Sequence, residues 1–473
     1  MNLTLLTSEI TVVTLALLLI VLDLLMPKEE TRRSLGYVAV LGIIGLLGYT
    51  FTLPAATDTV YQGLFIVDRF SIFFKQLFLI ATLFTFLFSF DYVDRLPGYR
   101  GEFYALLLLA VSGMMIMASA NDLLTIFVGT ELMTITFYIL VAFQFESIKS
   151  SEAGIKYMIL GSASSAVLLY GMSWVYGYTG SLVLVDIAQQ AHTNPAMLVG
   201  MGLIITGLFF KLAIIPFHMW APDIYEGAPT PITAMLSMGS KAAGFAVLIR
   251  ILFVAFEDLQ AHWLLIISIV AAITIVGGTI IAIWQTNIKR MMAYSSITQA
   301  GYMLSGLMAA DATGVKSILF YAMLYVFANV GAFAVIVAVR QHHGSNEIKD
   351  FSGLAQKSPL LAVVMMIALL SMAGIPPMAG FAGKLYIFTA VIEKGYMWLA
   401  LLGFVMSMVS VYYYLMVAKE MYMNEPQDQQ EFVISGQLRL VAVISLLGTL
   451  WIGIYPGPLA ALASAAANSL SIL

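Results

Sequence analysis

The sequence contains no cysteine and few charged residues. Charged residues make up 10% of its 473 positions, whereas 61% are hydrophobic. The absence of cysteine excludes disulfides, thiolate metal sites, cysteine-ligated iron–sulfur clusters and cysteine nucleophiles. Soluble domains carry about 25% charged and about 45–50% apolar residues. A soluble fold could not hide this much apolar surface from water, so the surrounding solvent is predicted to be lipid.

Sequence features of several other protein classes are also missing. No glycine-rich phosphate loop ending in Gly-Lys-Ser/Thr occurs, and no Gly-x-Gly-x-x-Gly turn opens a helix after a strand. The net charge of −4 is too small to suggest a nucleic-acid partner. The first apolar run starts near Leu3 without a basic segment before it, so a retained helix is expected rather than a cleaved signal.

Apolar runs long enough to span a bilayer, about 20 residues each, recur along the whole chain. They predict an all-α polytopic membrane protein with about fourteen transmembrane helices in a single membrane domain, 1–473. The twelfth run is too long for one helix and contains Gly374-Ile375-Pro376-Pro377, so we expect two half-helices there. The predicted spans are 3–26, 35–53, 68–90, 102–119, 122–145, 153–178, 197–219, 230–256, 262–285, 290–309, 316–341, 358–393, 396–422 and 437–460.

The distribution of basic residues predicts the orientation of the chain. With both termini outside, 14 of the 22 lysines and arginines fall in cytoplasmic loops. Only Arg69, Lys316 and Lys394 lie on or beside external loops. Because cytoplasmic loops of membrane proteins are enriched in lysine and arginine, this asymmetry favours external termini.

Two helices share a pattern that indicates an internal repeat. The seventh carries Lys211 and then Pro216, and the twelfth carries Pro376 and Pro377 and then Lys384. The two lie five helices apart, so they cross the membrane in opposite directions, as in an inverted repeat with a broken helix near each transport site. The expected division is N-terminal helices 1–3 in 1–101, helices 4–8 in 102–256, helices 9–13 in 262–422, and helix 14 in 437–473.

Four charged residues are predicted near the middle of the membrane: Glu131, Lys211, Lys241 and Lys384. A charge at this depth costs roughly 2.5–3.5 kcal/mol on insertion scales and needs a partner or a water-filled cavity. One interpretation is structural pairing, with Glu131 facing Lys211. The other is a proton relay, because burial favours a neutral lysine whereas a nearby carboxylate favours a charged one. Three lysines at similar depth exceed what one structural pair requires.

Three further titratable residues lie in or beside the predicted helices. Lys75 and Arg250 are expected nearer the outer ends of their helices, where long side chains can reach the interface, so a structural role is favoured. His218 follows the break at Pro216 and lies between Lys211 and the cytoplasm. Histidine changes charge near neutral pH, so His218 is either a hydrogen-bonded structural residue or part of a proton relay.

Three sequence blocks carry a family resemblance. They are 216–231 (PFHMWAPDIYEGAPTP) followed by Lys241, 287–297 (NIKRMMAYSSI), and 374–384 (GIPPMAGFAGK). Together they resemble the antiporter-like membrane subunits of respiratory complex I. The motif YEGAPTP looks most like that of the subunit N branch. The resemblance covers nearly the whole chain, and three long blocks in the same order are very specific.

The resemblance implies a fold and a set of site residues. The family fold has fourteen helices with inverted five-helix repeats. Glu131 and Lys211 look like the carboxylate–lysine pair of the first half-channel, Lys241 like the central connecting lysine, and Lys384 like the lysine of the second half-channel. Many relatives carry histidine in the tenth helix, where this chain has Gln299.

The glutamine at position 299, where many relatives carry histidine, leaves a gap in the implied relay. Glutamine cannot titrate, so water, Lys241 or Lys384 would have to bridge that position. Gln299 and the nearby Ser296 are therefore only candidate polar residues of the relay.

The resemblance implies a proton-translocating subunit in the membrane arm of an NADH:quinone oxidoreductase-like complex. No cofactor or metal is expected in this chain; NADH, flavin, iron–sulfur clusters and quinone would belong to other subunits. The expected partners are other membrane-arm subunits, including antiporter-like ones, lipid and protons, in the plasma or inner membrane. The alternatives are a subunit of a multi-subunit Na⁺/H⁺ antiporter or membrane-bound hydrogenase, and a passive structural subunit.

Overall fold

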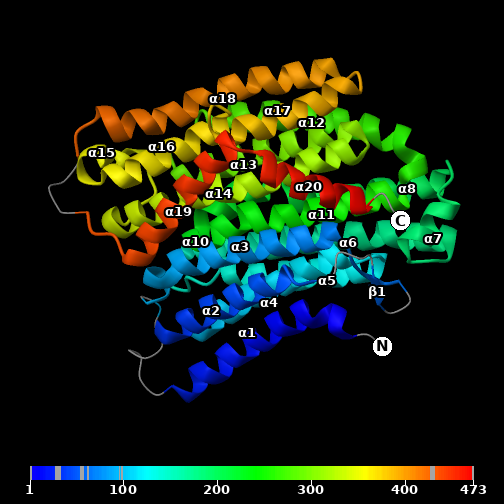
Figure 1. Cartoon of the computed structure of the whole chain (residues 1–473), viewed down its shortest axis with the longest axis horizontal. Helices are drawn as coiled ribbons and strands as arrows, with labels where there is room; N and C mark the ends of the chain where they lie inside the picture. Colours follow the sequence, from blue (N-terminus) through cyan, green and yellow to red (C-terminus); the bar gives the residue numbers. More distant parts are fainter. Residues whose placement is uncertain are drawn as a thin grey trace. The chain divides into compact units, whose positions relative to one another are not determined.

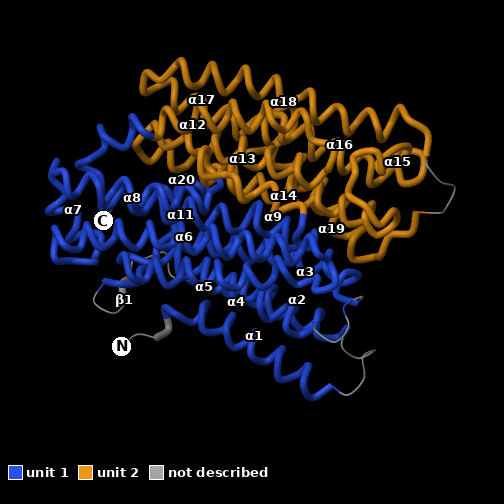
Figure 2. Tube along the Cα trace, turned by 180° about the vertical axis from the view of Figure 1, so that it is seen from behind, with its two compact units in different colours: residues 1–213, 227–266, 462–473 blue, residues 214–226, 267–461 orange. Residues whose placement is uncertain are grey.

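A computed structural model describes residues 3–26, 33–53, 58–60, 63–94, 96, 100–426 and 432–470. Lys28, Arg32 and Arg95, on which the orientation prediction partly depends, lie outside the described residues. The described chain divides into two compact units (Figure 2). Unit 1 comprises 1–213, 227–266 and 462–473, and unit 2 comprises 214–226 and 267–461.

Helices dominate unit 1 (Figure 1). Its one small sheet is an antiparallel pair in which Thr59 lies opposite Ile66. Helix α1 packs on α4, α4 on α5, α5 on α6 and α6 on α8. The elements are α1 Thr7–Leu25, α2 Arg33–Thr50, β1 Asp58–Val60, β2 Phe65–Val67, α3 Arg69–Val93, α4 Arg100–Ser119, α5 Leu123–Val141, α6 Ile148–Thr179, α7 Leu184–Gln190, α8 Pro195–Leu212, α10 Thr230–Met235 and α11 Lys241–Arg250.

Unit 2 is built around the long helix α14, which packs on α16, α17 and α19. Almost all of the α14 side chains are buried, so this helix forms the centre of the unit. The elements are α9 Trp220–Gly227, α12 Gln260–Ala282, α13 Ile288–Gly306, α14 Ala312–His343, α15 Leu354–Lys357, α16 Pro359–Ala373, α17 Ala379–Glu393, α18 Met397–Met423, α19 Gly436–Ile454 and α20 Gly457–Leu470, of which α9, α12 and α20 cross the boundary between the units.

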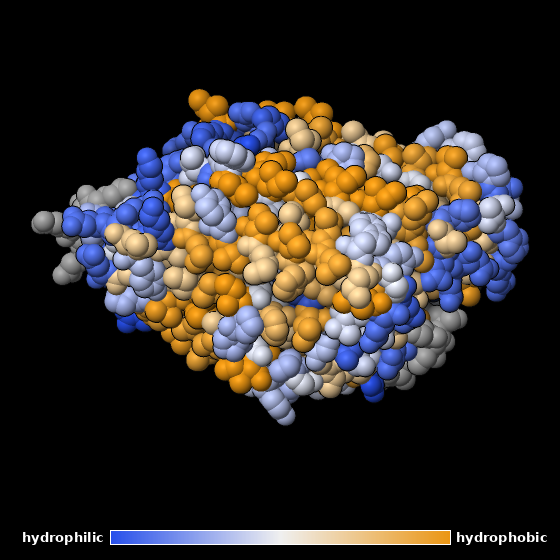
Figure 3. Space-filling view, turned by 90° about the horizontal axis from the view of Figure 1, so that it is seen from above, coloured by the Kyte–Doolittle hydropathy of each residue, from blue (hydrophilic) through white to orange (hydrophobic). Residues whose placement is uncertain are grey.

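Many of these helices have the length and composition of membrane spans. Among the described residues, twelve helices are long and apolar enough to cross a bilayer, and Pro359–Ala373 is a shorter apolar helix. Apolar side chains cover the middle of one face, and hydrophilic side chains gather toward its edges (Figure 3). The all-α, multi-pass membrane class predicted from the sequence is therefore confirmed, whereas the total of fourteen helices stays a prediction.

Both predicted helix breaks are present. Helix α16 ends at Ala373, Gly374 takes a left-handed conformation with φ +86°, and α17 begins at Ala379. Helix α8 ends at Leu212, and α9 begins only at Trp220. A proline in each gap accounts for the break, because it lacks an amide hydrogen and disfavours helical geometry in the residue before it. The Ile215–Pro216 and Pro376–Pro377 peptide bonds are cis.

Two of the predicted helix ranges are wrong in detail. The span 437–460 is two helices, because α19 ends at Ile454 and Pro456 precedes the start of α20. The span 230–256 is not a regular α-helix, because π-helical turns at Leu236–Ser240 and Ile251–Ala255 interrupt it. A π-helix has no simple signature in apolar periodicity, so neither interruption was predicted.

Lys75 and Arg250 do not reach toward an interface as expected. The ammonium of Lys75 lies 2.8 Å from a carboxylate oxygen of Glu9, and the side chain of Lys75 is fully buried. Arg250 donates to both carboxylate oxygens of Asp68 at 3.2 Å, and neither side chain is exposed. Each cation therefore pairs with an acid inside unit 1, since an unpaired buried charge would be far more costly.

Candidate functional site

Three helices of unit 1 bring Glu131 and Lys211 to the same place. Glu131 is on α5, and Lys211 is in the last turn of α8, on the far side of α6. The helices α6 and α8 approach closely at Gly207, where a Cβ atom would lie 2.7 Å from the Cβ of Leu168. Small residues at such contacts allow membrane helices to pack backbone against backbone. This packing places Ser165 of α6 between the acid and the lysine.

The contact between Glu131 and Lys211 runs through a hydroxyl group. Ser165 donates a hydrogen bond to Glu131 Oε1, and Lys211 Nζ donates to Ser165 Oγ at 3.4 Å. Lys211 Nζ also donates to Thr134 Oγ1 at 2.9 Å. Among the described contacts no direct ion pair joins Glu131 to Lys211, so the predicted carboxylate–lysine pair is a bridged one. Opening either hydrogen bond of Ser165 would break the hydrogen-bonded link between the two side chains.

All three lysines predicted near the middle of the membrane are buried in the protein. Lys211 is 2% exposed, Lys241 1% and Lys384 4%. Lys241 belongs to unit 1 and is the first residue of α11, directly after the π-helix Leu236–Ser240. π-Helical turns are frequent at functional sites, where they change the direction in which the following side chains point.

The break between α16 and α17 creates the binding site of the Lys384 ammonium. A helix that ends inside the protein leaves its last carbonyls without helical partners. Lys384 of α17 turns back to them and donates to Met372 O and Ala373 O, each at 2.9 Å. Its third hydrogen bond goes to Ser407 Oγ of α18 at 2.6 Å. The ammonium also benefits from the partial negative charge at the end of α16.

The ring of Tyr302 and a small cavity complete the surroundings of Lys384. Lys384 Nζ lies 4.6 Å from the centre of the Tyr302 ring, a cation–π contact. On another side lies a cavity of about 270 Å³, lined by Lys384, Ser407 and apolar residues of α17, α18 and the break. Lys384 therefore sits between a wholly buried polar cluster and a mostly apolar recess.

Gln299 contributes directly to this second site. Its amide nitrogen donates to Met372 O at 3.2 Å, the same carbonyl that accepts from Lys384. It also donates to the Tyr414 hydroxyl at 3.2 Å, and the Tyr321 hydroxyl donates to Gln299 Oε1. The structure thus brings Gln299 and Lys384 together. Ser296 is buried one turn earlier and donates to Ala293 O of its own helix.

His218 lies in the segment between α8 and α9 and belongs to unit 2. It is 8% exposed, and its ring is 6.5 Å from the ring of Tyr294 on α13. The break itself is held by a hydrogen bond from Ile215 N to Thr274 Oγ1 at 3.2 Å. The structure gives His218 no contact with Gln299 or Lys384, so its part in a relay stays a prediction.

Two of the three sequence blocks meet at one end of unit 2. Arg290 of the second block contacts Asp223 at 2.7 Å and Glu226 at 3.1 Å, both in the first block. Lys289 Nζ donates to the Glu226 carbonyl at 2.9 Å. These half-buried ion pairs explain why the charged residues of the two blocks occur together, since each holds the other in place.

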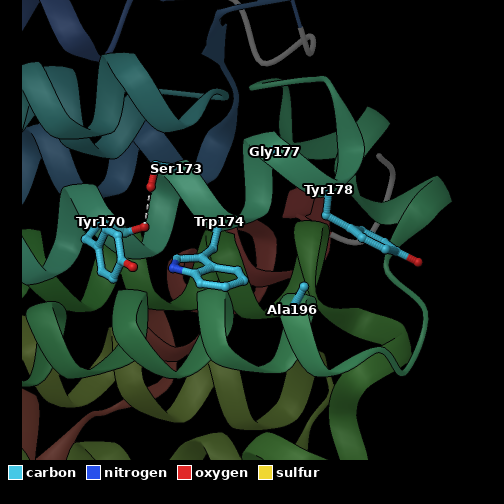
Figure 4. Close-up of a pocket in the computed structure, with 6 residues that line it drawn as sticks. All are labelled: Tyr170, Ser173, Trp174, Gly177, Tyr178 and Ala196. Atoms are coloured by element: carbon cyan, nitrogen blue, oxygen red, sulfur yellow. Dashed lines mark hydrogen bonds between the residues drawn. The ribbon is translucent and has the colours of Figure 1, made fainter.

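A larger cavity in unit 1 has a different character (Figure 4). It measures about 410 Å³, lies beside α6 and α8, and is lined by Tyr170, Ser173, Trp174, Gly177, Tyr178 and Ala196. No acidic or basic side chain lines it, and tyrosine and tryptophan are typical of the membrane–water interface. We assign no proton chemistry to this cavity. Within the described part of the chain, no group of three or more His, Asp or Glu side chains could hold a metal ion.

The sequence predicted the charged residues of the site but missed its hydroxyl groups. Thr134 could have been found, because it lies one helical turn after Glu131 and shares its face. Ser165, Ser407 and Tyr414 come from other helices, and nothing in their local sequence indicates which lysine or amide they meet. Their roles depend on which helices pack together.

Comparison with known proteins shows the class of this chain. Residues 120–410 match the family model described as NADH:quinone oxidoreductase/Mrp antiporter, TM. The chain therefore belongs to this family of membrane proteins. Proteins called NADH-quinone oxidoreductase subunit N are similar over its whole length: 54% identity in Heliobacterium modesticaldum, over 99% of this chain and 100% of the relative, and 50% in Moorella thermoacetica, over 97% of each. The resemblance to the subunit N branch is confirmed.

Solved structures agree with this assignment. A chain of respiratory complex I from Thermus thermophilus with bound aureothin matches with a TM-score of 0.83 and 31% identity, covering 97% of this chain and 99% of that one. A chain of an archaeal membrane-bound sulfane sulfur reductase matches with a TM-score of 0.87 and 25% identity, covering 99% and 98%. The Mrp complex of Dietzia sp. shares the fold, with a TM-score of 0.87 at 22% identity over 100% of this chain and 98% of that one.

Proposed function

We propose that this chain is a proton-translocating subunit in the membrane arm of an NADH:quinone oxidoreductase-type complex. The observation that carries the proposal is the buried cluster in which Lys211 reaches Glu131 through Ser165. A relay needs charged groups that can be joined and separated, and a hydroxyl bridge allows this without moving either helix. Full-length similarity to proteins called subunit N supports the choice of complex.

The proposed sequence of events begins at the bridge. When Ser165 joins Glu131 to Lys211, the carboxylate stabilises the charge on the lysine. When the bridge opens, that charge acts on the next lysine in the row, Lys241. Two charges about 8 Å apart interact by roughly 2 kcal/mol at an effective dielectric constant near 20. This is close to the cost of about 2.3 kcal/mol for moving one charge across 100 mV.

Lys384 is proposed to release the proton outward at the end of the row. In its charged form it is held by two carbonyls and the Ser407 hydroxyl. Loss of the proton weakens these bonds, because a neutral amine is a poorer donor than an ammonium. In this proposal Pro216, Pro376 and Pro377 serve by breaking the helices, and His218 takes up protons from the cytoplasmic side.

The proposal leaves the redox chemistry to other subunits. NADH, flavin, iron–sulfur clusters and quinone would be bound there, and quinone reduction would drive the opening of the Ser165 bridge. The distribution of lysine and arginine supports a plasma or inner membrane location with both termini outside. The repeats 102–256 and 262–422 would supply the first and second half-channels.

Two other functions receive less support. A Na⁺/H⁺ antiporter or hydrogenase-type subunit would share this fold, so the fold does not separate these classes; the similarity to proteins called subunit N favours the oxidoreductase. A passive structural subunit would need its buried charges only for packing. Three buried lysines, two of which donate to hydroxyl groups or to the end of a helix, exceed that need.

Proton pumping and electron transfer in membrane vesicles test the proposal. In Lys211→Ala, pumping is expected to fall by about a hundredfold or more, the lower side of what a proton-transfer group contributes. Lys156→Ala is the matched control, because Lys156 is 43% exposed. Assembly is checked on a native gel. Wild-type pumping in an assembled Lys211→Ala complex would make the charges structural and refute the proposal.

A second pair of variants tests the hydroxyl bridge itself. Ser165→Ala removes the link between Glu131 and Lys211 and is expected to lower pumping without preventing assembly. Ser173→Ala is the control on the same helix, because that hydroxyl donates to the Tyr170 carbonyl at 2.7 Å and to no other group among the described residues. Equal pumping in the two variants would show that the bridge has no part in the relay.

A further inference from the structure

Gln299 is the centre of a buried hydrogen-bond network in unit 2. It is 1% exposed and takes part in three side-chain hydrogen bonds. The Tyr321 hydroxyl donates to its Oε1, and its Nε2 donates to the Tyr414 hydroxyl and to Met372 O, each at 3.2 Å. The sequence singled out Gln299 because it cannot titrate, and the network shows which groups around it can pass a proton.

One hydrogen bond of the Tyr414 oxygen has a fixed direction. An amide nitrogen only donates, so the Tyr414 oxygen is the acceptor in its bond with Gln299. The Tyr414 hydroxyl lies 2.5 Å from Ser295 Oγ, and either hydroxyl can be the donor in that bond. Gln299 therefore occupies one lone pair of the Tyr414 oxygen and leaves its hydrogen and its other lone pair to Ser295 and water.

The network reaches Lys384 through a shared carbonyl. Met372 O accepts from Lys384 Nζ at 2.9 Å and from Gln299 Nε2 at 3.2 Å. Three hydrogen bonds thus lead from Lys384 Nζ through Met372 O and Gln299 Nε2 to the Tyr414 hydroxyl. The direct distance from Lys384 Nζ to the Tyr414 oxygen is shorter than the sum of these three bonds. A proton would cross this distance through water molecules.

Only some groups of this network can carry a proton. Carboxamides and peptide carbonyls do not take up and release protons near neutral pH. A hydroxyl can accept a proton on its oxygen while its own hydrogen leaves on the other side, so it ends neutral. Tyr321 ends at Gln299, whereas Tyr414 leads on to Ser295.

We propose that Tyr414 and Ser295 transfer protons to and from the Lys384 site, and that Gln299 orients Tyr414 instead of carrying the proton itself. In one step, water gives a proton to the Ser295 oxygen, and the original hydrogen of Ser295 moves to the Tyr414 oxygen. The original hydroxyl hydrogen of Tyr414 then passes through water to the neutral amine of Lys384. Ser295 and Tyr414 end neutral and Lys384 ends charged, and the hydroxyl hydrogens rotate back before the next transfer. This inference rests on the proposed function.

Tyr414→Phe in the assembled complex is the first test. It removes one oxygen and keeps the ring, and proton pumping is expected to fall about tenfold or more. Tyr325→Phe is the matched control: Tyr325 is 3% exposed in the same unit, and its hydroxyl has no hydrogen-bond partner among the described residues. Pumping in the control is expected to equal that of the wild type.

A second substitution separates proton transfer from a structural role. In Tyr414→Phe combined with Gln299→His, the imidazole can accept a proton on one nitrogen and release one from the other. Pumping is therefore expected to recover at least severalfold over Tyr414→Phe alone. A merely structural hydroxyl would not be replaced in this way, because a second buried substitution disturbs the packing further.

The outcomes distinguish this inference from the proposed function, provided that Lys211→Ala is measured in parallel. Loss of pumping in Tyr414→Phe with recovery in the double variant supports the inference. Wild-type pumping in Tyr414→Phe overturns it, and so does a loss that Gln299→His does not restore. If Lys211→Ala pumps normally, the proposed function fails. If only Lys211→Ala loses pumping, the function stands and the hydroxyl route is wrong.

Discussion

The buried pair of Asp68 and Arg250 makes a quantitative prediction about stability. Asp68 caps α3 by accepting from Ser71 N at 2.7 Å, and Arg250 binds both of its oxygens at 3.2 Å. Arg250 also donates to Ala118 O at 2.9 Å and lies over the ring of Phe70 at 5.0 Å. Neither charged side chain is exposed. Removing one partner of such a pair typically costs about 3–5 kcal/mol, because the other charge is left buried.

Three variants resolve this cost. Asp68→Asn keeps an oxygen for the helix cap but removes the charge, so it is expected to destabilise the protein by about 3–5 kcal/mol. Arg250→Met should cost a similar amount. The double variant leaves no charge; Ala118 O then lacks its donor and the amide nitrogen introduced at position 68 lacks an acceptor, each at about 1–3 kcal/mol and without a buried charge. It should therefore be more stable than either single variant.

The free energy of unfolding in detergent micelles, titrated with a denaturing detergent, measures all four proteins as a double-mutant cycle. The result is decided by the free energies of unfolding of the double variant and of the two single variants. If the double variant loses about as much stability as the two single variants together, the pair is not coupled and the reasoning from burial is wrong. Proton pumping in the double variant should remain near the wild-type level, because this pair lies outside the proposed relay.

Two further predictions concern the second unit. Gly374→Ala and Gly395→Ala share the backbone cost of φ +86° and +87°, about 1–2 kcal/mol each, but only at Gly374 would the new Cβ lie 2.9 Å from Lys384 Cδ. Only Gly374→Ala should therefore lower pumping in vesicles; equal effects would refute the steric argument. The second prediction concerns Asp311 and Lys394. Burial raises the pKa of Asp311, but its bonds to Lys394 and to backbone amides lower that pKa by more, so the net shift is downward. The contact with Asp311 raises the pKa of Lys394. The stability from Asp311 is thus present above pH 3.8 and lost below it, and that from Lys394 is present below pH 10.5 and lost above it. Melting temperature against pH should show both losses, each under about 1 kcal/mol, and Asp311→Asn should abolish them.

The membrane class and most helix positions followed from the sequence alone, because hydrophobic length is a local property. The breaks followed too, since proline acts on its own helix wherever it stands. The end of the fourteenth predicted span was wrong because Pro456 was not read as a break. The twelfth span was divided correctly because proline breaks a helix, and the same reasoning would have divided the fourteenth span at Pro456.

The candidate site was predictable only in part. A charge in an apolar run is visible in the sequence, so Glu131 and the lysines stood out. Their partners are hydroxyl groups on other helices, and serine and threonine are common in membrane helices. Choosing Ser165 among them requires knowledge of which faces of α5, α6 and α8 meet. The same holds for Lys384, whose acceptors exist only because α16 ends beside it.

The π-helical turn at Leu236–Ser240 has a consequence for how this protein could change over evolutionary time. A π-turn is equivalent to one residue inserted into an α-helix. Deleting a single residue there would restore regular geometry and swing Lys241 by about 100° around the helix axis, with no change of its side chain. Insertions and deletions of one codon, and not only substitutions, could therefore redirect or silence this lysine. An alignment that forbids a gap at this point would compare Lys241 with residues that face another way.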